Sequence, residues 1–157
     1  MTEGWSRRHV LGLALVATAG LPPRLMAQSP ARAITVHKDP SCGCCGGWVE
    51  HVRKAGYAVS VVDESDLEAV KRRLWIPSEL WACHTAVLGE YVLEGHVPAH
   101  ALRRLLVERP AVAGVAVPGM PVGSPGMEGE PMDTYDVIGF AGAQRVHFGR
   151  YRGETPA

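Results

Sequence analysis

Residues 33–56 read AITVHKDPSCGCCGGWVEHVRKAG, and this segment predicts a strand, a loop and a helix in immediate succession. The first five residues are rich in β-branched side chains, which is typical of a short strand. A helical pattern covers about 45–55, with Trp48 and Val52 on one face, and Gly56 is a suitable C-terminal stop. The cysteine-rich loop therefore lies where the first strand meets the first helix.

The rest of the chain continues the alternation of strands and helices. The patterns predict a strand at 57–62, a helix capped by Asp66 and running to about residue 74, a hairpin of 85–88 and 91–93, a helix at 99–107, and a terminal hairpin of 135–140 and 145–148. This order is that of a thioredoxin-like α/β domain, in which helices flank a mixed sheet. We expect one such domain over residues 33–151.

Cysteines are concentrated at the start of the first predicted helix. Three of the four, Cys42, Cys44 and Cys45, lie within four residues, and the fourth, Cys83, is followed directly by His84. A helix N-terminus favours thiolate over thiol, and thiolate is the form that binds metal or attacks a disulfide. In thioredoxin-like folds a cis-proline stands just before the third strand and faces the C-x-x-C. Cys83 and His84 take that place here, so we expect a sulfur-rich site with His84 beside it.

Several chemistries fit these cysteines. A patch of thiolates can bridge soft metal ions, and the C-x-x-C frame can act as a thiol-disulfide oxidoreductase with Cys42 as nucleophile and Cys45 as resolving thiol. Two structural disulfides, Cys42–Cys45 and Cys44–Cys83, are a further alternative. Structural zinc is another, although C-x-C-C lacks the usual spacer between paired zinc ligands.

Residues 117–132, hereafter the Met loop, have a different composition from the rest of the chain. Pro and Gly exclude a regular helix or strand, Pro-Gly-Met occurs twice, and the loop contains Met120, Met127 and Met132. Thioethers are soft ligands that favour Cu(I). We therefore expect Met120 and Met127 to ligate or cover copper, with packing against the core as the alternative.

The remaining histidines carry no motif. His51 lies two helical turns beyond Cys44, so we expect a surface position, and the others are interpreted as ordinary polar residues: His37, His96, His100 and His147.

The N-terminus predicts an export signal over residues 1–27. A twin-arginine pattern, Ser6-Arg7-Arg8, precedes an apolar run at 10–20 that is too short for a permanent membrane span. Such signals export folded proteins, and export of the unfolded chain is the alternative. We therefore expect a periplasmic location. Because conditions there are oxidising, we expect the thiols to form disulfides, bind metal or take part in catalysis.

The charge balance argues against nucleic acid as a partner. Residues 1–27 hold three of the 16 basic residues and one of the 16 acidic ones, so the remainder has a net charge of −2. The remainder has no basic stripe that would follow a phosphate backbone.

Four segments together resemble the CopG-type family of bacterial periplasmic copper-resistance proteins. They are KDPSCGCCGGW at 38–48, CHTAV at 83–87, EGHVPA at 94–99, and VPGMP with GSPGME within 117–128. The resemblance covers nearly the whole chain after the export signal.

This resemblance implies a thioredoxin-like fold and copper bound as a thiolate-bridged, multinuclear Cu(I) cluster that serves copper resistance. By matching position, the implied thiolates are Cys42, Cys44, Cys45 and Cys83, with Met120 and Met127 as nearby soft groups. It also implies interconversion of Cu(I) and Cu(II), which would make the protein a copper oxidoreductase with a periplasmic copper-handling or electron-transfer partner.

Overall fold

The computed structural model describes Met1 and residues 32–157, so the predicted export signal lies, apart from Met1, outside the described residues. The described residues form a mixed eight-stranded sheet in the order β2-β1-β3-β4-β5-β6-β7-β8. This confirms the predicted α/β class. The strands are β1 (Ala33–Lys38), β2 (Ala58–Asp63), β3 (His84–Leu88), β4 (Tyr91–Glu94), β5 (Gly114–Ala116), β6 (Thr134–Ala141), β7 (Gln144–Arg152) and β8 (Thr155–Pro156).

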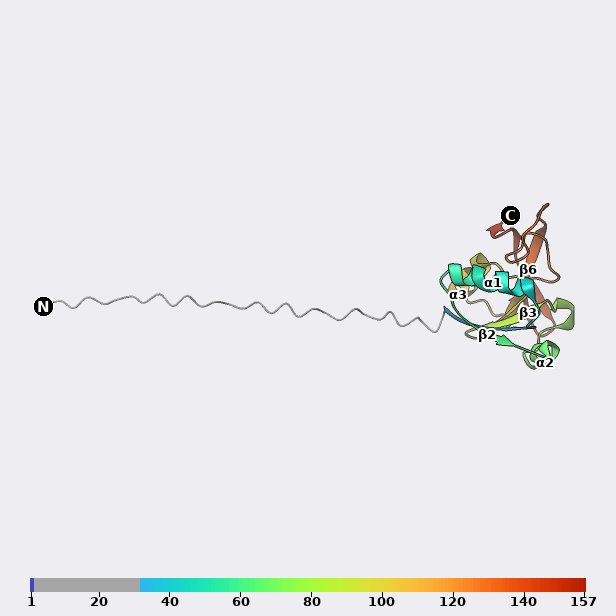
Figure 1. The fold of residues 1–157 in the computed structure, drawn as a ribbon, viewed down its shortest axis with the longest axis horizontal. Coiled ribbons are helices and arrows are strands. Elements are labelled where there is room, and N and C mark those ends of the chain that lie inside the picture. The colour runs from blue at the N-terminus through green and yellow to red at the C-terminus, as the bar shows by residue number, and fades with distance from the viewer. Residues whose placement is uncertain (2–31) are drawn as a thin grey trace.

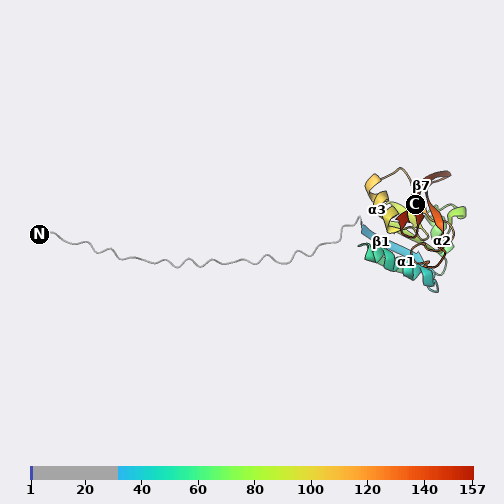
Figure 2. The same cartoon turned by 90° about the horizontal axis from the view of Figure 1, so that it is seen from above.

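Among the described residues, three α-helices and the short 3-10 helix η2 accompany the sheet. They are α1 (Gly43–Lys54), α2 (Leu67–Arg73), α3 (Ala99–Glu108) and η2 (Ser78–Leu80). Helices α1 and α3 lie on one face of the sheet and α2 on the other (Figure 1). β1 and α1 run side by side in both ribbon views (Figures 1 and 2).

The main core lies between the sheet and the face that carries α1 and α3. Trp48 and Val52 of α1 and Leu102 of α3 are fully buried there, against Val36 of β1 and Leu93 of β4. Burying a large apolar side chain stabilises the fold by roughly 1.5–3 kcal/mol. The apolar face predicted for the first helix is therefore the one that packs α1 against the sheet, and Leu102 attaches α3 in the same way.

Local signals set the helix ends. Asp66 Oδ1 accepts a hydrogen bond from the Ala69 amide and caps α2. Gly56 takes a positive φ of 89° after α1, as a helix stop requires. Helix α3 begins with help from another helix, because His51 Nε2 accepts from the Ala99 amide at 2.9 Å. The expectation that His51 is a simple surface residue was therefore wrong.

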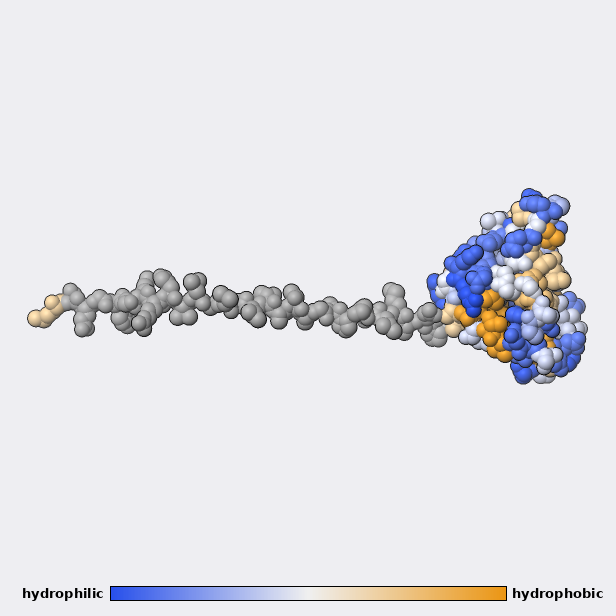
Figure 3. Space-filling model, in the orientation of Figure 1, coloured by the Kyte–Doolittle hydropathy of each residue, from blue (hydrophilic) through white to orange (hydrophobic). Residues whose placement is uncertain are grey.

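Strand β5 was not predicted. It is three residues long and carries no periodic pattern, and its pairing with β4 and β6 defines it. The C-terminal hairpin of β6 and β7 extends the sheet as predicted, with a register shift between Val137 and Ile138. At the other end, β2 is an edge strand whose Val61 and Val62 are about 40% exposed, and Figure 3 shows apolar surface in that area.

Within the described part of the chain, no helix is both long and apolar enough to traverse a bilayer.

Candidate metal centre

Strand directions bring four separate segments to one end of the sheet. Strand β1 ends at Lys38, which pairs with His84 at the beginning of the antiparallel β3. Strand β4 returns antiparallel to β3 and ends there at Glu94, and β5 runs parallel to β4 and ends at Ala116 beside Glu94. Four segments therefore start or end at this end of the sheet: the loop before α1, the residue before β3, the segment after β4 and the Met loop.

The first of these segments holds a disulfide at the start of α1. Cys42 is the N-cap residue and is bonded to Cys45 in the first turn, with the two Cα atoms 5.5 Å apart. The preceding turn is fixed by Asp39, whose carbonyl oxygen accepts from the Cys42 amide at 3.0 Å and whose Oδ1 accepts from the Ser41 amide at 2.7 Å. The bond closes the C-x-x-C frame, while Cys44 and Cys83 remain free thiols.

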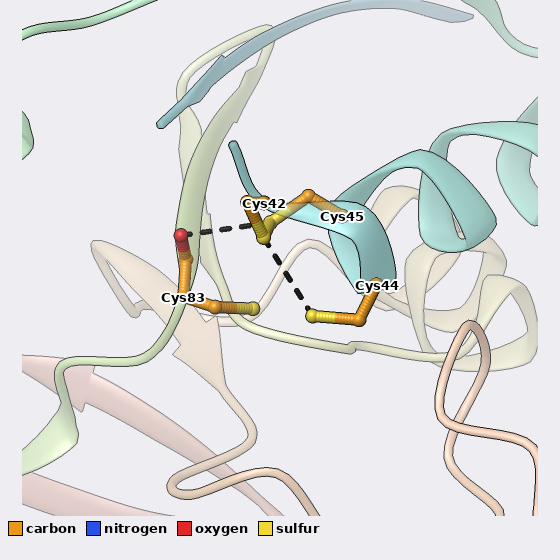
Figure 4. A group of neighbouring side chains, drawn as sticks. All are labelled: Cys42, Cys44, Cys45 and Cys83. Atoms are coloured by element: carbon orange, nitrogen blue, oxygen red, sulfur yellow. Dashed lines mark hydrogen bonds between the residues drawn. A yellow bond between two sulfur atoms is a disulfide. The ribbon is translucent and has the colours of Figure 1, made fainter. Parts of the chain in front are cut away.

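The sulfur atoms of all four cysteines lie within 4.8 Å of one another. Cys44 Sγ is 3.6 Å from Cys42 Sγ, and Cys45 Sγ is 3.6 Å from the Cys83 carbonyl oxygen. Cys44 and Cys83 direct their sulfurs toward the same space beside the disulfide (Figure 4). The structure thus brings together three cysteines of one helix turn and a fourth that is distant in sequence. The second predicted structural disulfide, Cys44–Cys83, is not formed.

The protonation of the cysteines follows from their burial. Cys45 is fully buried, whereas the other three are half-buried. Burial first, and the neighbouring Cys44 second, raise the pKa of Cys83 to about 12. Without a metal ion Cys83 is therefore a neutral thiol at pH 7. Binding of a soft ion would displace its proton, because the thiolate is the ligand.

Two buried histidines, His84 and His96, lie close to the sulfur atom of Cys83. His84 Nδ1 lies 3.3 Å from Cys83 Sγ, and His96 Nε2 lies 2.8 Å from the same sulfur. His84 was expected near the site and is placed there. His96 was interpreted as an ordinary polar residue, and that was wrong: it is fully buried in the site.

The hairpin register contains the signal that could have identified His96. Leu88 pairs with Tyr91 and Thr85 with Glu94, so continuing the register by two residues sets Cys83 opposite His96. The predicted turn at residues 89–90 already implied this pairing.

A buried polar network holds the backbone next to Cys83. Glu94 is fully buried, and its carboxylate accepts from the Ala82 amide at 2.6 Å, from Thr85 Oγ1 at 2.7 Å and from Lys71 Nζ at 2.5 Å. Lys71 also donates to Thr85 Oγ1 at 2.9 Å. Buried charges are tolerated when they are paired and hydrogen-bonded. This network therefore fixes the Ala82 amide and the Thr85 side chain, which lie on either side of Cys83 in sequence.

The Met loop packs against the other side of the site. His96 Nδ1 donates to the Pro125 carbonyl oxygen at 2.7 Å, and Gly126 touches the first turns of α1, where a Cβ would meet Cys44 O at 2.7 Å. Met127 follows Gly126 and is half-buried, whereas Met120 is 53% exposed. The loop backbone thus packs against the helix turn that holds Cys44 and against His96, and the two predicted soft ligands, Met120 and Met127, lie on either side of this contact in sequence.

The chain is similar to known proteins in sequence and in structure. The family described as "Protein of unknown function, DUF411" matches residues 80–127. The structure is similar to two solved structures described as forms 1 and 2 of the copper resistance protein CopG. Form 1 is 46% identical, with a TM-score of 0.72, over 77% of this chain and 98% of that one. Form 2 is 45% identical, with a TM-score of 0.72, over 76% and 97%. No curated protein matches the chain significantly. At this identity and coverage, the chain belongs to the CopG family of copper resistance proteins.

Proposed function

We propose that this protein binds Cu(I) in a thiolate-bridged, multinuclear cluster formed by Cys42, Cys44, Cys45 and Cys83, and that it thereby serves copper resistance. The observation that carries the proposal is the gathering of four sulfur atoms within 4.8 Å. Soft thiolates select Cu(I), which prefers two or three such ligands per ion. Four sulfurs this close serve several ions best when each sulfur bridges two of them.

The cluster requires the reduced protein, because Cys42 and Cys45 supply thiolates only when their disulfide is open. Their oxidation to the disulfide releases two electrons and two protons. Reduction of two Cu(II) ions to Cu(I) takes up two electrons. Oxidation of the cysteine pair therefore supplies the two electrons that this copper oxidoreductase reaction needs. An external electron partner must reduce the disulfide again before the next turnover.

Three further parts of the proposal rest on the sequence and the fold. The strand order β2-β1-β3-β4, with α1 following β1 and the cysteines at its start, supports a thioredoxin-like fold. The docking of the Met loop onto α1 supports Met120 and Met127 as soft groups that retain copper or shield it from water. The twin-arginine pattern, with the copper resistance proteins among the relatives, supports export to the periplasm.

Titration of the reduced protein with Cu(I), under anaerobic conditions and against a coloured Cu(I) chelator, tests the cluster. We expect more than one tightly bound Cu(I) per chain. The matched control is the same protein with its disulfide intact, which should bind fewer ions because two of the four sulfurs are unavailable. Saturation of the reduced protein at one ion or fewer would contradict a bridged cluster.

A second function, thiol-disulfide exchange, is favoured by the disulfide itself. Cys42 is half-buried and Cys45 fully buried, as expected of a nucleophile and its resolving partner. An insulin-reduction assay on metal-free and copper-loaded protein, beside thioredoxin, discriminates the two functions. We expect weak activity, because the third thiol, Cys44, lies 3.6 Å from Cys42 Sγ and competes for it. Robust turnover that is lost in Cys42→Ser would favour the oxidoreductase.

A further inference from the structure

Cys83 belongs to two groups of candidate ligands at once. Besides the four-sulfur group, it forms a second group with His84 and His96, whose ligand atoms also lie within 4.8 Å of one another. Both imidazoles approach the one sulfur, at 3.3 Å from His84 Nδ1 and 2.8 Å from His96 Nε2. The site therefore has a sulfur face and an imidazole face that share Cys83.

His96 is held in the tautomer that a ligand needs. Its Nδ1 lies 2.7 Å from the Pro125 carbonyl oxygen, which can only accept, so Nδ1 carries the proton. Nε2 then keeps a lone pair, and that atom faces Cys83 Sγ. A ligating histidine commonly donates its other N–H to a backbone carbonyl in this way, which fixes both the ring orientation and the tautomer.

Within the described part of the chain, the His84 ring makes no polar contact other than the one with Cys83 Sγ. The ring is fully buried, with its centroid 4.5 Å from that of Trp48 and 5.1 Å from that of His96. Its Nε2 has no hydrogen-bond partner among the described residues, and its Nδ1 meets only Cys83 Sγ. Burying an imidazole with an unpartnered nitrogen is costly. Ligation at Nδ1 gives a reason for that cost, whereas packing alone would be served better by an apolar residue.

The disulfide changes the two faces unequally. With Cys42 bonded to Cys45, the sulfur face keeps only the thiols of Cys44 and Cys83. The imidazole face loses nothing. Two imidazoles and one thiolate are a mixed donor set that suits borderline divalent ions, and trigonal His2Cys sites are known for Cu(II).

We propose that Cys83, His84 and His96 form a second metal subsite, which binds one divalent ion, Cu(II) by preference, while the Cys42–Cys45 disulfide is in place. The inference rests on the proposed function in that the subsite shares Cys83 with the Cu(I) cluster. It adds that the cysteine pair decides which face of the site holds the ion: open, it offers four thiolates to Cu(I); closed, it leaves the imidazole face to a divalent ion.

Co(II) is the probe for the experiment, because thiols do not reduce it and its spectrum reports thiolate ligation through a charge-transfer band. The full chain is prepared with two free thiols, so that one disulfide is closed, and peptide mapping establishes that it joins Cys42 to Cys45. We expect one Co(II) per chain with a thiolate band. Cys44→Ser should keep this binding, because the subsite does not need that thiol. His147→Gln, a control on the exposed face of β7, should keep it too.

His96→Gln and His84→Gln should each weaken Co(II) binding by at least about tenfold. Since both histidines are buried and a variant can fail to fold, X-ray absorption of the Co(II)-loaded Cys44→Ser protein, which keeps both histidines, provides a second measurement. It should detect imidazole nitrogens together with a single sulfur in the Cys44→Ser background. An absence of Co(II) binding, equal binding in the folded histidine variants, or a shell without imidazole would overturn the proposal.

The same preparations, reduced and titrated with Cu(I), separate this proposal from the one it rests on. If the reduced wild type binds no Cu(I) cluster, the proposed function fails whatever Co(II) does. If the cluster forms and Co(II) does not bind the disulfide form, only the imidazole subsite is wrong.

Discussion

Gly47 of α1 and Gly126 of the Met loop are in backbone contact: a Cβ built on Gly47 would lie 2.8 Å from Gly126 Cα. This contact holds the Met loop against the helix turn that contains Cys44. A Cβ on the preceding helix residue, Gly46, meets no described atom within 4 Å. The two adjacent glycines therefore separate the effect of loop docking from that of helix propensity.

Gly47→Ala should dislodge the Met loop, whereas Gly46→Ala should not. Overpacking a tight contact typically costs about 1–3 kcal/mol, while Gly to Ala within a helix stabilises by roughly 0.5–1 kcal/mol. We expect Gly47→Ala to lower the free energy of unfolding in urea and to increase proteolysis within the loop. Equal behaviour of the two variants would mean that the loop does not depend on this contact.

Cys83→Ser should impair copper binding more than any other single cysteine change, because Cys83 is common to both groups of ligands. We expect fewer Cu(I) ions per chain and a loss of affinity beyond the roughly 10–100-fold that follows removal of an outer partner. The chelator-competition titration measures both. Unchanged stoichiometry and affinity would place the copper elsewhere.

Replacing Met120 and Met127 together by Leu should leave the copper-free protein folded and weaken copper retention. Leu is close to Met in volume, so the cost in stability should stay below about 1.5 kcal/mol, and Met120 is 53% exposed. Cu(I) release to a chelator and oxidation of the loaded protein in air should both become faster. A large fall in the stability of the copper-free variant would instead identify these side chains as packing residues.

Glu94→Gln should destabilise the protein strongly, because it leaves Lys71 buried without its counter-charge. Breaking one partner of a buried pair costs about 3–5 kcal/mol. The double variant Glu94→Gln with Lys71→Met removes both charges and should recover much of the loss. Urea denaturation of the wild type, both single variants and the double variant measures the coupling. Additive losses would show that the pair is not a unit.

Stability should fall on mild acidification, in part through His51. Burial lowers the pKa of His51, with Glu154 partly opposing the shift, and its neutral Nε2 accepts from the first amide of α3. Above the ordinary histidine pKa of about 6.5 this contribution is complete. As the pH falls below that value the unfolded chain takes up the proton first, so stability is lost until the folded pKa is passed.

His51→Gln tests this assignment, since glutamine retains an acceptor and does not titrate. Between about pH 7.5 and 5.5, on either side of that reference value, the metal-free wild type should lose more stability than His51→Gln. His84 and His96, whose pKa values burial also lowers, keep part of the dependence in the variant. An identical loss of stability in both proteins would show that His51 does not contribute to the pH dependence.

Local sequence signals predicted most of the fold but only part of the site. The apolar face of α1 and the Asp66 cap of α2 depend on neighbours within a turn or two, and both were readable. Strand β5 depends on pairing with distant strands, and a three-residue segment carries no period of its own. Charge misleads at Lys71, which stands next to the exposed Arg72 in sequence but is buried beside Val70, where it pairs with Glu94.

The disulfide joins residues only three positions apart, which limits what it can do for thermal stability. In the chain-entropy model, a cross-link over so short a loop restricts the unfolded chain by about 2 kcal/mol, against about 4.7 kcal/mol for a 100-residue loop. It ties no distant parts of the sheet to one another. Opening it should therefore lower the melting temperature by less than half as much as opening a 100-residue cross-link would, so the protein can exchange dithiol for disulfide while its sheet stays folded.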